Sequence, residues 1–225
     1  SSNFDPGGFS EFIRLSEGHV RHTLLKIPDS LDSLSASFTE PLACVVRNVK
    51  RLKLVPGDAV GIVGLGSIGL LTGQLLRHLK ISVLGFDLDP ARLKLAHELG
   101  LATIGADEAP AAISQLTEGR GLDVLTFTAG TQSLLPSRLK WLRGGGTLNI
   151  FSELKPDAAA SPIDFNEVYH RELTILSSYS SSLDDLKESL ALLAAGAINV
   201  KPLTLKTYGL DAFAPVGVHG HQANE

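Results

Sequence analysis

Three glycines with the spacing Gly64-x-Gly66-x-x-Gly69 are the residues of this sequence whose chemistry is most distinctive. They follow the apolar run 59–63 and precede the stretch LLTGQLLRHLK, which has helical periodicity. The first glycine allows a tight turn from strand to helix, the second lets the backbone approach a pyrophosphate, and the third lets the helix lie close to the sheet. The pattern predicts a dinucleotide site at the helix N-terminus. The same turn also fits another doubly wound protein or a nucleoside-binding methyltransferase.

An acidic residue ends the next expected strand. The run SVLGFD ends at Asp87, about twenty residues after the first glycine, where a carboxylate grips the ribose diol of adenosine. A carboxylate there repels a 2′-phosphate, so the sequence favours NAD over NADP. Asp87 also fits a role as the cap of a helix that begins at Pro90. Arg92, in the first turn of that helix, fits equally well as a partner of adenine or as a solvated side chain.

Small residues and backbone amides follow the later strands of the pattern. Because the carboxyl ends of parallel strands share one edge of a sheet, these segments converge where a nicotinamide needs partners for its carboxamide. Each segment taken singly also fits ordinary turn chemistry. The residues predicted to bind the cofactor are Gly64, Leu65, Gly66, Ser67, Ile68, Gly69, Asp87, Leu88, Arg92, Thr128, Ala129, Gly130, Ile150, Phe151, Ser152, Ser178 and Tyr179.

Alternating strands and helices must position these residues. Helix-length stretches separate six apolar strand cores, at 59–63, 82–87, 102–105, 124–128, 147–151 and 173–177. This alternation predicts right-handed crossovers and an α/β fold of the Rossmann type, with a doubly wound parallel six-stranded sheet in the order 3-2-1-4-5-6.

The flanking regions have a different character. Residues 7–27 alternate apolar and turn residues, which predicts short antiparallel strands. Residues 34–52 have helical spacing, with Ser33 as the expected N-cap and with Pro41 interrupting or restarting the helix. The C-terminal part predicts one amphipathic helix over 183–198, then one strand and an irregular end over 203–217.

Composition excludes several functional classes. The net charge of −4 with no basic block argues against nucleic acid or an acidic membrane surface as a partner, and no apolar run reaches the length of a membrane span. Cys44 is the only cysteine, so no internal disulfide can form and a cytoplasmic location is expected. There is no signal peptide and no methionine, which is typical of a processed, trimmed or engineered fragment.

Several segments together resemble a known family: GGFSEFIRL, FTEPLACVVRNVKRLKLVPGDAVGIVGLGSIGLLTGQLL, VLGFDLDPARLKLAHELGLATIGA, LRGGGTLNIF and RELTILSSYS. The sequence resembles the zinc-dependent medium-chain alcohol dehydrogenases, in the branch of sorbitol or polyol and threonine dehydrogenases. The resemblance implies a GroES-like catalytic domain and a Rossmann domain, with zinc polarising an alcohol so that a hydride passes to NAD. Residues 1–33 and 201–225 would then be remnants of the catalytic domain, 34–58 a linking helix region, and 59–200 the NAD-binding domain.

The resemblance also implies a metal role for Glu40. In the family, the glutamate of EPLAC lies at the catalytic zinc, as a ligand or through the metal-bound water, which makes Glu40 the one candidate catalytic and metal residue. It also fits an acid favoured at a helix start before Pro41, although the close match of this segment favours the metal role. Cys44, one turn further, is expected to be buried filler. His219 and His221 form an H-x-H pair in a polar tail, which is more typical of a surface feature, and the other five histidines are expected in solvent.

The sequence departs from the family before Gly7. The family's cysteine ligand, Gly-His-Glu motif and four-cysteine lobe have no counterpart there. A catalytic zinc takes three protein ligands, so zinc is doubtful in this chain and the chain as given is expected to be catalytically incomplete.

Three functions remain open from the sequence. The first is an NAD-dependent oxidoreductase of a secondary alcohol or polyol, zinc-assisted in the full-length protein. The second is a non-catalytic NAD-binding module. The third is a zinc-free reductase of the quinone-oxidoreductase type, against which Glu40 argues. In the family pattern, the edge strand near 173–180 pairs with its copy to form a homodimer or homotetramer.

Overall fold

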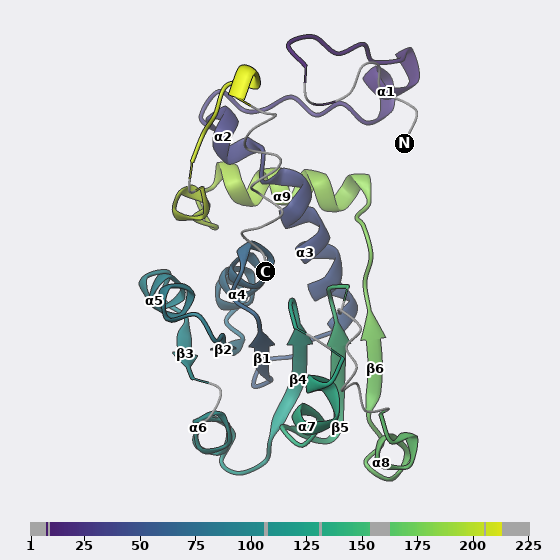
Figure 1. Ribbon diagram of the computed structural model, residues 1–225. Helices are drawn as coiled ribbons and strands as arrows, with labels where there is room; N and C mark the ends of the chain where they lie inside the picture. The colour runs from purple at the N-terminus through teal and green to yellow at the C-terminus, as the bar shows by residue number, and fades with distance from the viewer. Residues whose placement is uncertain are drawn as a thin grey trace. The chain divides into compact units, whose positions relative to one another are not determined.

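The chain divides into two compact units, described separately here. Figure 1 draws its computed structural model. One unit comprises residues 27–200 and the other residues 1–26 with 201–225. The residues that the structure describes are 8, 10–105, 108–130, 132–153, 163–204 and 206–212.

A six-stranded parallel sheet forms the centre of the larger unit (Figure 1). Its order is β3-β2-β1-β4-β5-β6, which confirms the predicted order. The register is continuous along β1 and β2, and shifts once between β4 and β5, near Leu122. The strands are β1 (Ala59–Val63), β2 (Ser82–Phe86), β3 (Ala102–Ile104), β4 (Leu122–Phe127), β5 (Leu142–Ile150) and β6 (Thr174–Ser177).

Helices cover the sheet because its central strands are apolar on both faces. All six residues of β4 are buried, as are four of the five in β1. Helices α6 (Ala109–Thr117) and α7 (Leu134–Leu139) share a hydrophobic cluster with β2, β4 and β5. The larger unit also contains the helices α3 (Thr39–Leu52), α4 (Ser67–His78), α5 (Pro90–Glu98), α8 (Phe165–His170) and α9 (Leu183–Ala194). Helix α3 packs on α4 and α9.

Asp123 fastens the beginnings of β1, β4 and β5 together. Its carboxylate accepts hydrogen bonds from the Ala59 N–H at 2.8 Å, from Arg120 Nη1 at 2.6 Å and from Arg143 Nε at 2.5 Å. Burial would raise the pKa of Asp123, but these three donors outweigh it and hold the pKa below its ordinary value. The carboxylate therefore stays charged within the fold.

The segment before β1 differs from the prediction of one helix capped by Ser33. Asp32 is the N-cap, accepting from the Ser35 N–H at 2.8 Å, and a short helix α2 (Ser33–Ala36) precedes α3. The break between α2 and α3 comes before Pro41, which lies inside the first turn of α3. Proline is tolerated there because that N–H needs no helical partner. Of the two predicted roles, Pro41 therefore does not interrupt a helix but lies where the second helix begins.

The smaller unit also differs from the prediction. Its described residues before Lys26 contain the helix α1 (Glu17–His22) and a single bridge position at Arg14, not antiparallel strands. Ser16 Oγ caps α1 by accepting from the His19 N–H, so local capping outweighs the alternating pattern. The strand predicted within 203–217 is wrong for 203–204 and 206–212, since that stretch contains 3-10 helices Lys201–Leu203 and Leu210–Ala212. The rest of that prediction lies outside the described residues.

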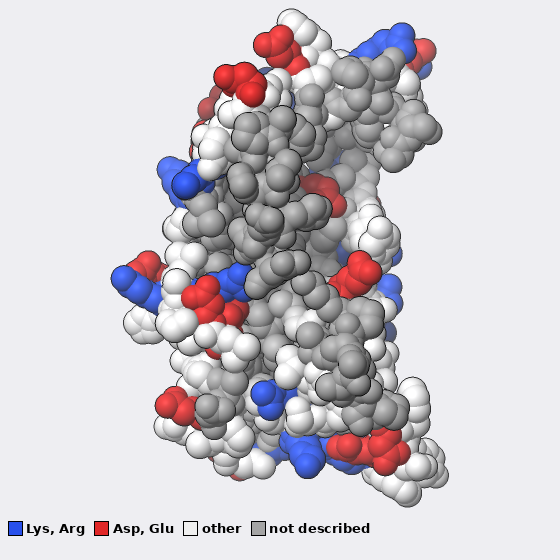
Figure 2. Space-filling view, in the orientation of Figure 1, with Lys and Arg blue, Asp and Glu red and all other residues white. Residues whose placement is uncertain are grey.

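Two surface properties bear on the predicted partners. On the face seen in Figure 2, the Lys and Arg side chains of the described residues lie interspersed with Asp and Glu rather than in one patch. Among the described helices, none is long and apolar enough to cross a bilayer.

Candidate functional site

The three glycines each have a different geometry in the turn between β1 and α4. Gly64 has φ of +94°, and a Cβ there would lie 2.6 Å from the Ala129 Cβ. A Cβ on Gly69 would overlap the carbonyl oxygen of Gly64. Gly66 is the N-cap of α4, and a Cβ there would meet no atom within 4 Å. The backbone at the start of α4 is therefore open to a ligand, while the other two glycines are needed by the fold.

The remaining predicted residues of the turn divide by exposure. The side chain of Leu65 is fully buried and packs over Gly85 of β2. Ser67 is exposed as the first residue of α4, and Ile68 is partly buried beside a cavity described below. The Leu65 side chain is therefore part of the core, and only the backbone of Leu65 belongs to the site.

Asp87 is held by the backbone rather than extended into solvent. Its Oδ2 accepts from the Leu65 N–H at 2.7 Å, and its Oδ1 accepts from the Asp89 N–H at 2.9 Å. Only 8% of the side chain is exposed, and Arg92 Nη1 lies 3.7 Å from Oδ2. Asp89, not Asp87, caps α5 by accepting from the Ala91 N–H. Of the two roles open to Asp87 in the sequence, the helix cap thus belongs to Asp89.

The cavity beside Asp87 lies at the carboxyl ends of β1, β2 and β4. We call it the Asp87 cavity; its volume is about 370 Å³. It brings together six of the predicted residues, including Leu88, whose side chain is 88% exposed. These six are Gly64, Asp87, Leu88, Arg92, Ala129 and Gly130.

Thr128 ties the end of β4 to the glycine turn. Its Oγ1 donates to the carbonyl oxygens of Gly64 at 2.6 Å and Val63 at 3.2 Å. The next two residues then turn along the cavity wall, with Gly130 at a φ of +121°. Thr128 therefore positions the turn, whereas its two successors face the cavity.

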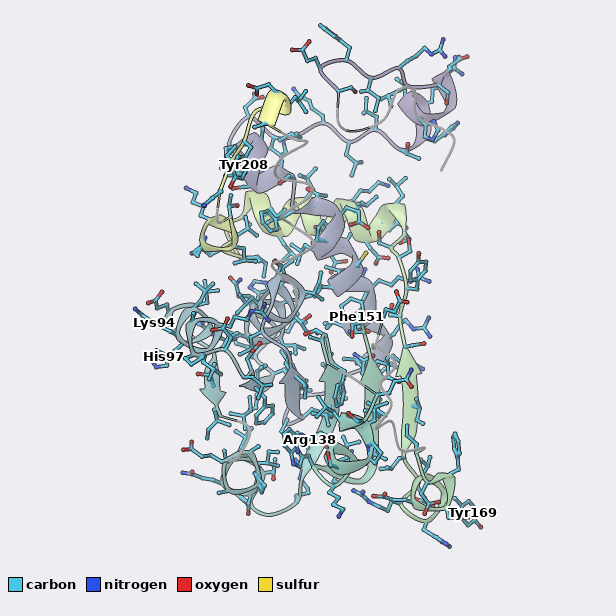
Figure 3. The ribbon with its side chains drawn as sticks, viewed as in Figure 1. Lys94, His97, Arg138, Phe151, Tyr169 and Tyr208 are labelled. Atoms are coloured by element: carbon cyan, nitrogen blue, oxygen red, sulfur yellow. The ribbon has the colours of Figure 1, made fainter. Side chains whose placement is uncertain are left out.

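Six lining residues of the Asp87 cavity were not predicted from the sequence, and two of them, Arg138 and Trp141, are in contact with each other. Arg138, labelled on α7 in Figure 3, has its guanidinium carbon 4.5 Å from the centroid of the Trp141 ring. The Trp141 ring in turn lies 4.7 Å from that of Phe86, at the end of β2. The sequence carries one signal that could have indicated this pair: its single tryptophan follows an arginine by three residues.

A second cavity lies at the same edge of the sheet, beyond the ends of β5 and β6. We call it the Glu40 cavity; its volume is about 650 Å³. Phe151, labelled in Figure 3, comes directly after β5, and Tyr179 follows β6 with 93% of its side chain exposed. The predicted residues gathered here are Glu40, Ile68, Ile150, Phe151, Ser152, Ser178 and Tyr179.

Two hydroxyl groups in the Glu40 cavity lack partners. The Oγ atoms of Ser152 and Ser178 are buried and have no hydrogen-bond partner among the described residues. A buried hydroxyl without a partner is costly unless a ligand or water supplies one. These two atoms are therefore available to a polar group in the cavity.

Cys44 also lines this cavity, so the prediction that it is buried filler is wrong. The thiol is half-buried and donates to Glu40 Oε1 at 3.2 Å, because residues four apart lie on one face of α3. Burial, together with the hydrogen bond and the charge of Glu40, raises the pKa of Cys44 to about 11. The group is therefore a thiol at neutral pH.

A zinc site does not assemble from the described residues. Among them, no group of three His, Cys, Asp or Glu side chains is placed to hold a metal ion. Glu40 and Cys44 are two such side chains, and His219 and His221 lie outside the described residues. The described part of the chain thus does not fit a catalytic zinc, which takes three protein ligands.

The chain is similar to known dehydrogenases. The family model described as "Zinc-binding dehydrogenase" matches residues 67–195, more than half of the chain. Sorbitol dehydrogenase of Bacillus subtilis (strain 168) is 28% identical over 209 residues, which cover 91% of this chain and 57% of that protein. L-threonine 3-dehydrogenase of Alteromonas mediterranea is 24% identical over 212 residues, covering 92% of this chain and 60% of that protein. The chain thus spans less than two thirds of these relatives.

Solved structures of dehydrogenases also superpose on this chain. The alcohol dehydrogenase of Aeropyrum pernix superposes with a TM-score of 0.79 at 26% identity, over 96% of this chain and 62% of that one. A putative zinc-binding dehydrogenase of Sinorhizobium meliloti 1021, bound to NADP, superposes with a TM-score of 0.74 at 28% identity, over 85% and 57%. The resemblance found in the sequence is thereby confirmed, and the chain belongs to the zinc-binding dehydrogenase family.

Proposed function

We propose that this chain binds NAD along the carboxyl edge of its sheet. We propose that it is the cofactor-binding part of an oxidoreductase that transfers a hydride between NAD and a secondary alcohol or polyol. The observation that carries the proposal is the placement of two cavities beside one glycine turn. Gly64 lines the Asp87 cavity, and Ile68, four residues further along the chain, lines the Glu40 cavity. A dinucleotide has two such halves joined by a pyrophosphate.

The adenosine half belongs in the Asp87 cavity. The carboxylate of Asp87 is held in place by two backbone N–H groups, and its remaining lone pairs can accept from the ribose hydroxyls. The relative from Sinorhizobium meliloti carries NADP, so family membership alone does not decide between the cofactors. We choose NAD because a negative charge at Asp87 repels a 2′-phosphate.

The pyrophosphate belongs at the N-terminus of α4. The backbone at Gly66 is unobstructed, and the first N–H groups of α4 have no helical acceptors. Ser67, exposed at the first position of α4, adds a hydroxyl donor.

The nicotinamide half belongs in the Glu40 cavity. When bound, NAD supplies a hydride acceptor there. Ser152 and Ser178 have unpartnered hydroxyls that can bond a carboxamide, and the apolar side chains of Ile68 and Ile150 exclude water from the ring. Glu40 and Cys44 line the same cavity, where the thiol donates its hydrogen bond to Glu40 Oε1.

The substrate class follows from the relatives. Sorbitol dehydrogenases, a D-arabitol-phosphate dehydrogenase and a probable D-xylulose reductase A are among the proteins similar to this chain.

We also propose a division of the chain into domains. Residues 59–200 form the NAD-binding domain, 34–58 the linking helix region, and 1–33 with 201–225 parts of the catalytic domain.

We further propose assembly through β6. This strand is at the edge of the described sheet, and Ile175 is 41% exposed on it. An exposed apolar edge favours pairing with a second copy, giving a homodimer or a homotetramer. Light scattering of the chain and of Ile175→Pro tests this: the proposal expects an oligomer that the proline splits.

A direct assay of NADH formation tests the proposed reaction. NADH formation would be followed at pH 8 with NAD and a panel of polyols and secondary alcohols, using the protein from the complete gene. Turnover with a panel member that requires NAD supports the proposal. NADH binding without turnover on any panel member would instead favour the non-catalytic module.

A further inference from the structure

Arg138 and Trp141 form one wall of the Asp87 cavity. The rings of Phe86 and Trp141 pack with their centroids 4.7 Å apart, and the Arg138 guanidinium carbon lies 4.5 Å from the Trp141 centroid. Phe86 and Trp141 are almost fully buried, whereas Arg138 is only partly buried, and all three line the cavity. The two rings are tilted by 45° to each other, and the guanidinium group is the most exposed member of a cluster anchored in the core.

The charge of Arg138 is not neutralised by the described residues. No ion pair joins it to any of them, and its close contact is the indole ring. The other arginine of the cavity, Arg92, differs, because it lies 3.7 Å from the carboxylates of both Asp87 and Asp89. Arg138 is thus a planar cation that lies over an aromatic ring and has no acidic partner in the described part of the chain.

We propose that Arg138, supported by Trp141, is the surface on which the adenine ring of the cofactor stacks. This inference rests on the proposed NAD binding. The glycine turn and Asp87 occupy the part of the cavity suited to phosphate and ribose, which leaves the wall of Leu134, Arg138 and Trp141 for the base. Adenine is neutral and has a π face, and guanidinium groups stack on such faces while an ammonium group cannot.

The same geometry assigns Arg92 a different role. Since the two acids beside Arg92 hold its charge, it shapes the ribose end of the cavity, whereas Arg138 is free to contact the base. The sequence left two roles open for Arg92, a solvated side chain or a partner of adenine. The proposal assigns the role of adenine partner to Arg138 instead.

Binding of AMP tests the assignment without any need for catalysis. AMP, NADH and NADPH would be titrated by calorimetry into the wild-type chain, Arg138→Ala, Arg138→Lys and the control Lys140→Ala, which changes an exposed neighbour on the same helix end. We expect Arg138→Ala to weaken both ligands on the order of tenfold. Arg138→Lys should lose nearly as much, because it keeps the charge but not the plane. Lys140→Ala should bind like wild type.

Trp141 gives a second, local readout because it is the only tryptophan. AMP should change its fluorescence in the wild-type chain, and the change should be smaller in Arg138→Ala at saturating AMP. Urea unfolding of each variant separates a loss of binding from a loss of fold, since Arg138 is only partly buried and its variants should unfold at a similar midpoint.

The outcomes separate this inference from the proposed function. NADH binding by wild type with unchanged AMP affinity in Arg138→Ala would overturn the adenine assignment and leave NAD binding intact. A selective loss of NADPH affinity in Arg138→Ala would also overturn it, by making Arg138 a 2′-phosphate ligand. Failure of wild type to bind NADH or AMP would overturn both.

Discussion

The carboxylate of Asp87 accepts a hydrogen bond from the backbone N–H of Leu65, with 2.7 Å between Oδ2 and the nitrogen. The bond joins the end of β2 to the glycine turn that follows β1. The acidic residue and the phosphate-binding backbone are thus one unit, and the turn is braced before any ligand arrives. A substitution of Asp87 should therefore change the conformation of the glycine turn as well as the contact with the ribose.

Replacement of Asp87 by alanine should weaken NADH binding roughly 10- to 100-fold, because it removes a charged acceptor for the ribose hydroxyls and the brace on Leu65. The same change should raise the relative affinity for NADPH, since it removes the repulsive charge. Parallel calorimetric titrations with NADH and NADPH measure both effects. A wild-type preference for NADPH would contradict the assignment.

Gly69→Ala should damage the turn itself. The new Cβ would overlap the Gly64 carbonyl oxygen, so the turn must shift, at a cost of about 1–3 kcal/mol in the free energy of unfolding. Gly105→Ala is the matched control, because a Cβ there meets nothing within 4 Å. Urea unfolding and NADH titration check the pair. If Gly69→Ala were as stable as Gly105→Ala and bound NADH normally, the described contact between α4 and the turn would be wrong.

Cys44 should resist alkylation in the folded chain. With its pKa raised to about 11, roughly one thiol in a thousand is ionised at pH 8, and the thiolate is the reactive form. Glu40→Gln removes the neighbouring negative charge, so it should lower the pKa of Cys44 and speed the reaction. Mass spectrometry after iodoacetamide treatment gives the rates unambiguously, since no other cysteine is present. Equal rates at pH 8 in the two folded proteins would refute the pairing.

Acid stability should depend on Asp123. Its pKa is lower in the folded chain than in the unfolded one, where a free aspartate titrates near about 3.9. Its contribution is therefore fully present above that value and is lost as the pH falls through the lower, folded pKa. Asp123→Asn should lower the free energy of unfolding by about 2 kcal/mol at pH 7, discounted because the two arginines are partly exposed.

The pH profile of that variant provides the check. Urea unfolding of wild type and Asp123→Asn between pH 7 and pH 3 should give curves that converge at the acid end. A stability difference that stays constant over this range would show that the charge of Asp123 does not contribute.

The sheet could be predicted from the sequence because its signal is local and repeated. Each strand is a short apolar run followed by a helix-length stretch, and the crossover rule then fixes the order. The glycine spacing likewise located the turn. The alternating pattern around Phe12 and Ile13 failed, since the Ser16 cap of α1 is a stronger local signal than period-two hydrophobicity.

The missed residues of the site depend on contacts between distant segments. Arg138 and Trp141 reach the cavity because Trp141 packs on Phe86, which is far away in the sequence. Cys44 was placed in the core because its helix is apolar, although it faces the cavity with Glu40. The sequence shows that Asp87 follows an apolar strand, but its bond to Leu65 requires the register of β1 and β2.

Gly66→Val tests NAD binding most directly. A Cβ at Gly66 meets no atom within 4 Å, and the residue has φ of −69°, so valine should fit without strain and the chain should fold. The branched side chain would nevertheless fill the space in front of the α4 N-terminus where the pyrophosphate belongs. Calorimetric titration of NADH into wild type and Gly66→Val should show binding by wild type and none by the folded variant. Equal binding by both, or none by wild type, would contradict the assignment of this sheet edge to the cofactor.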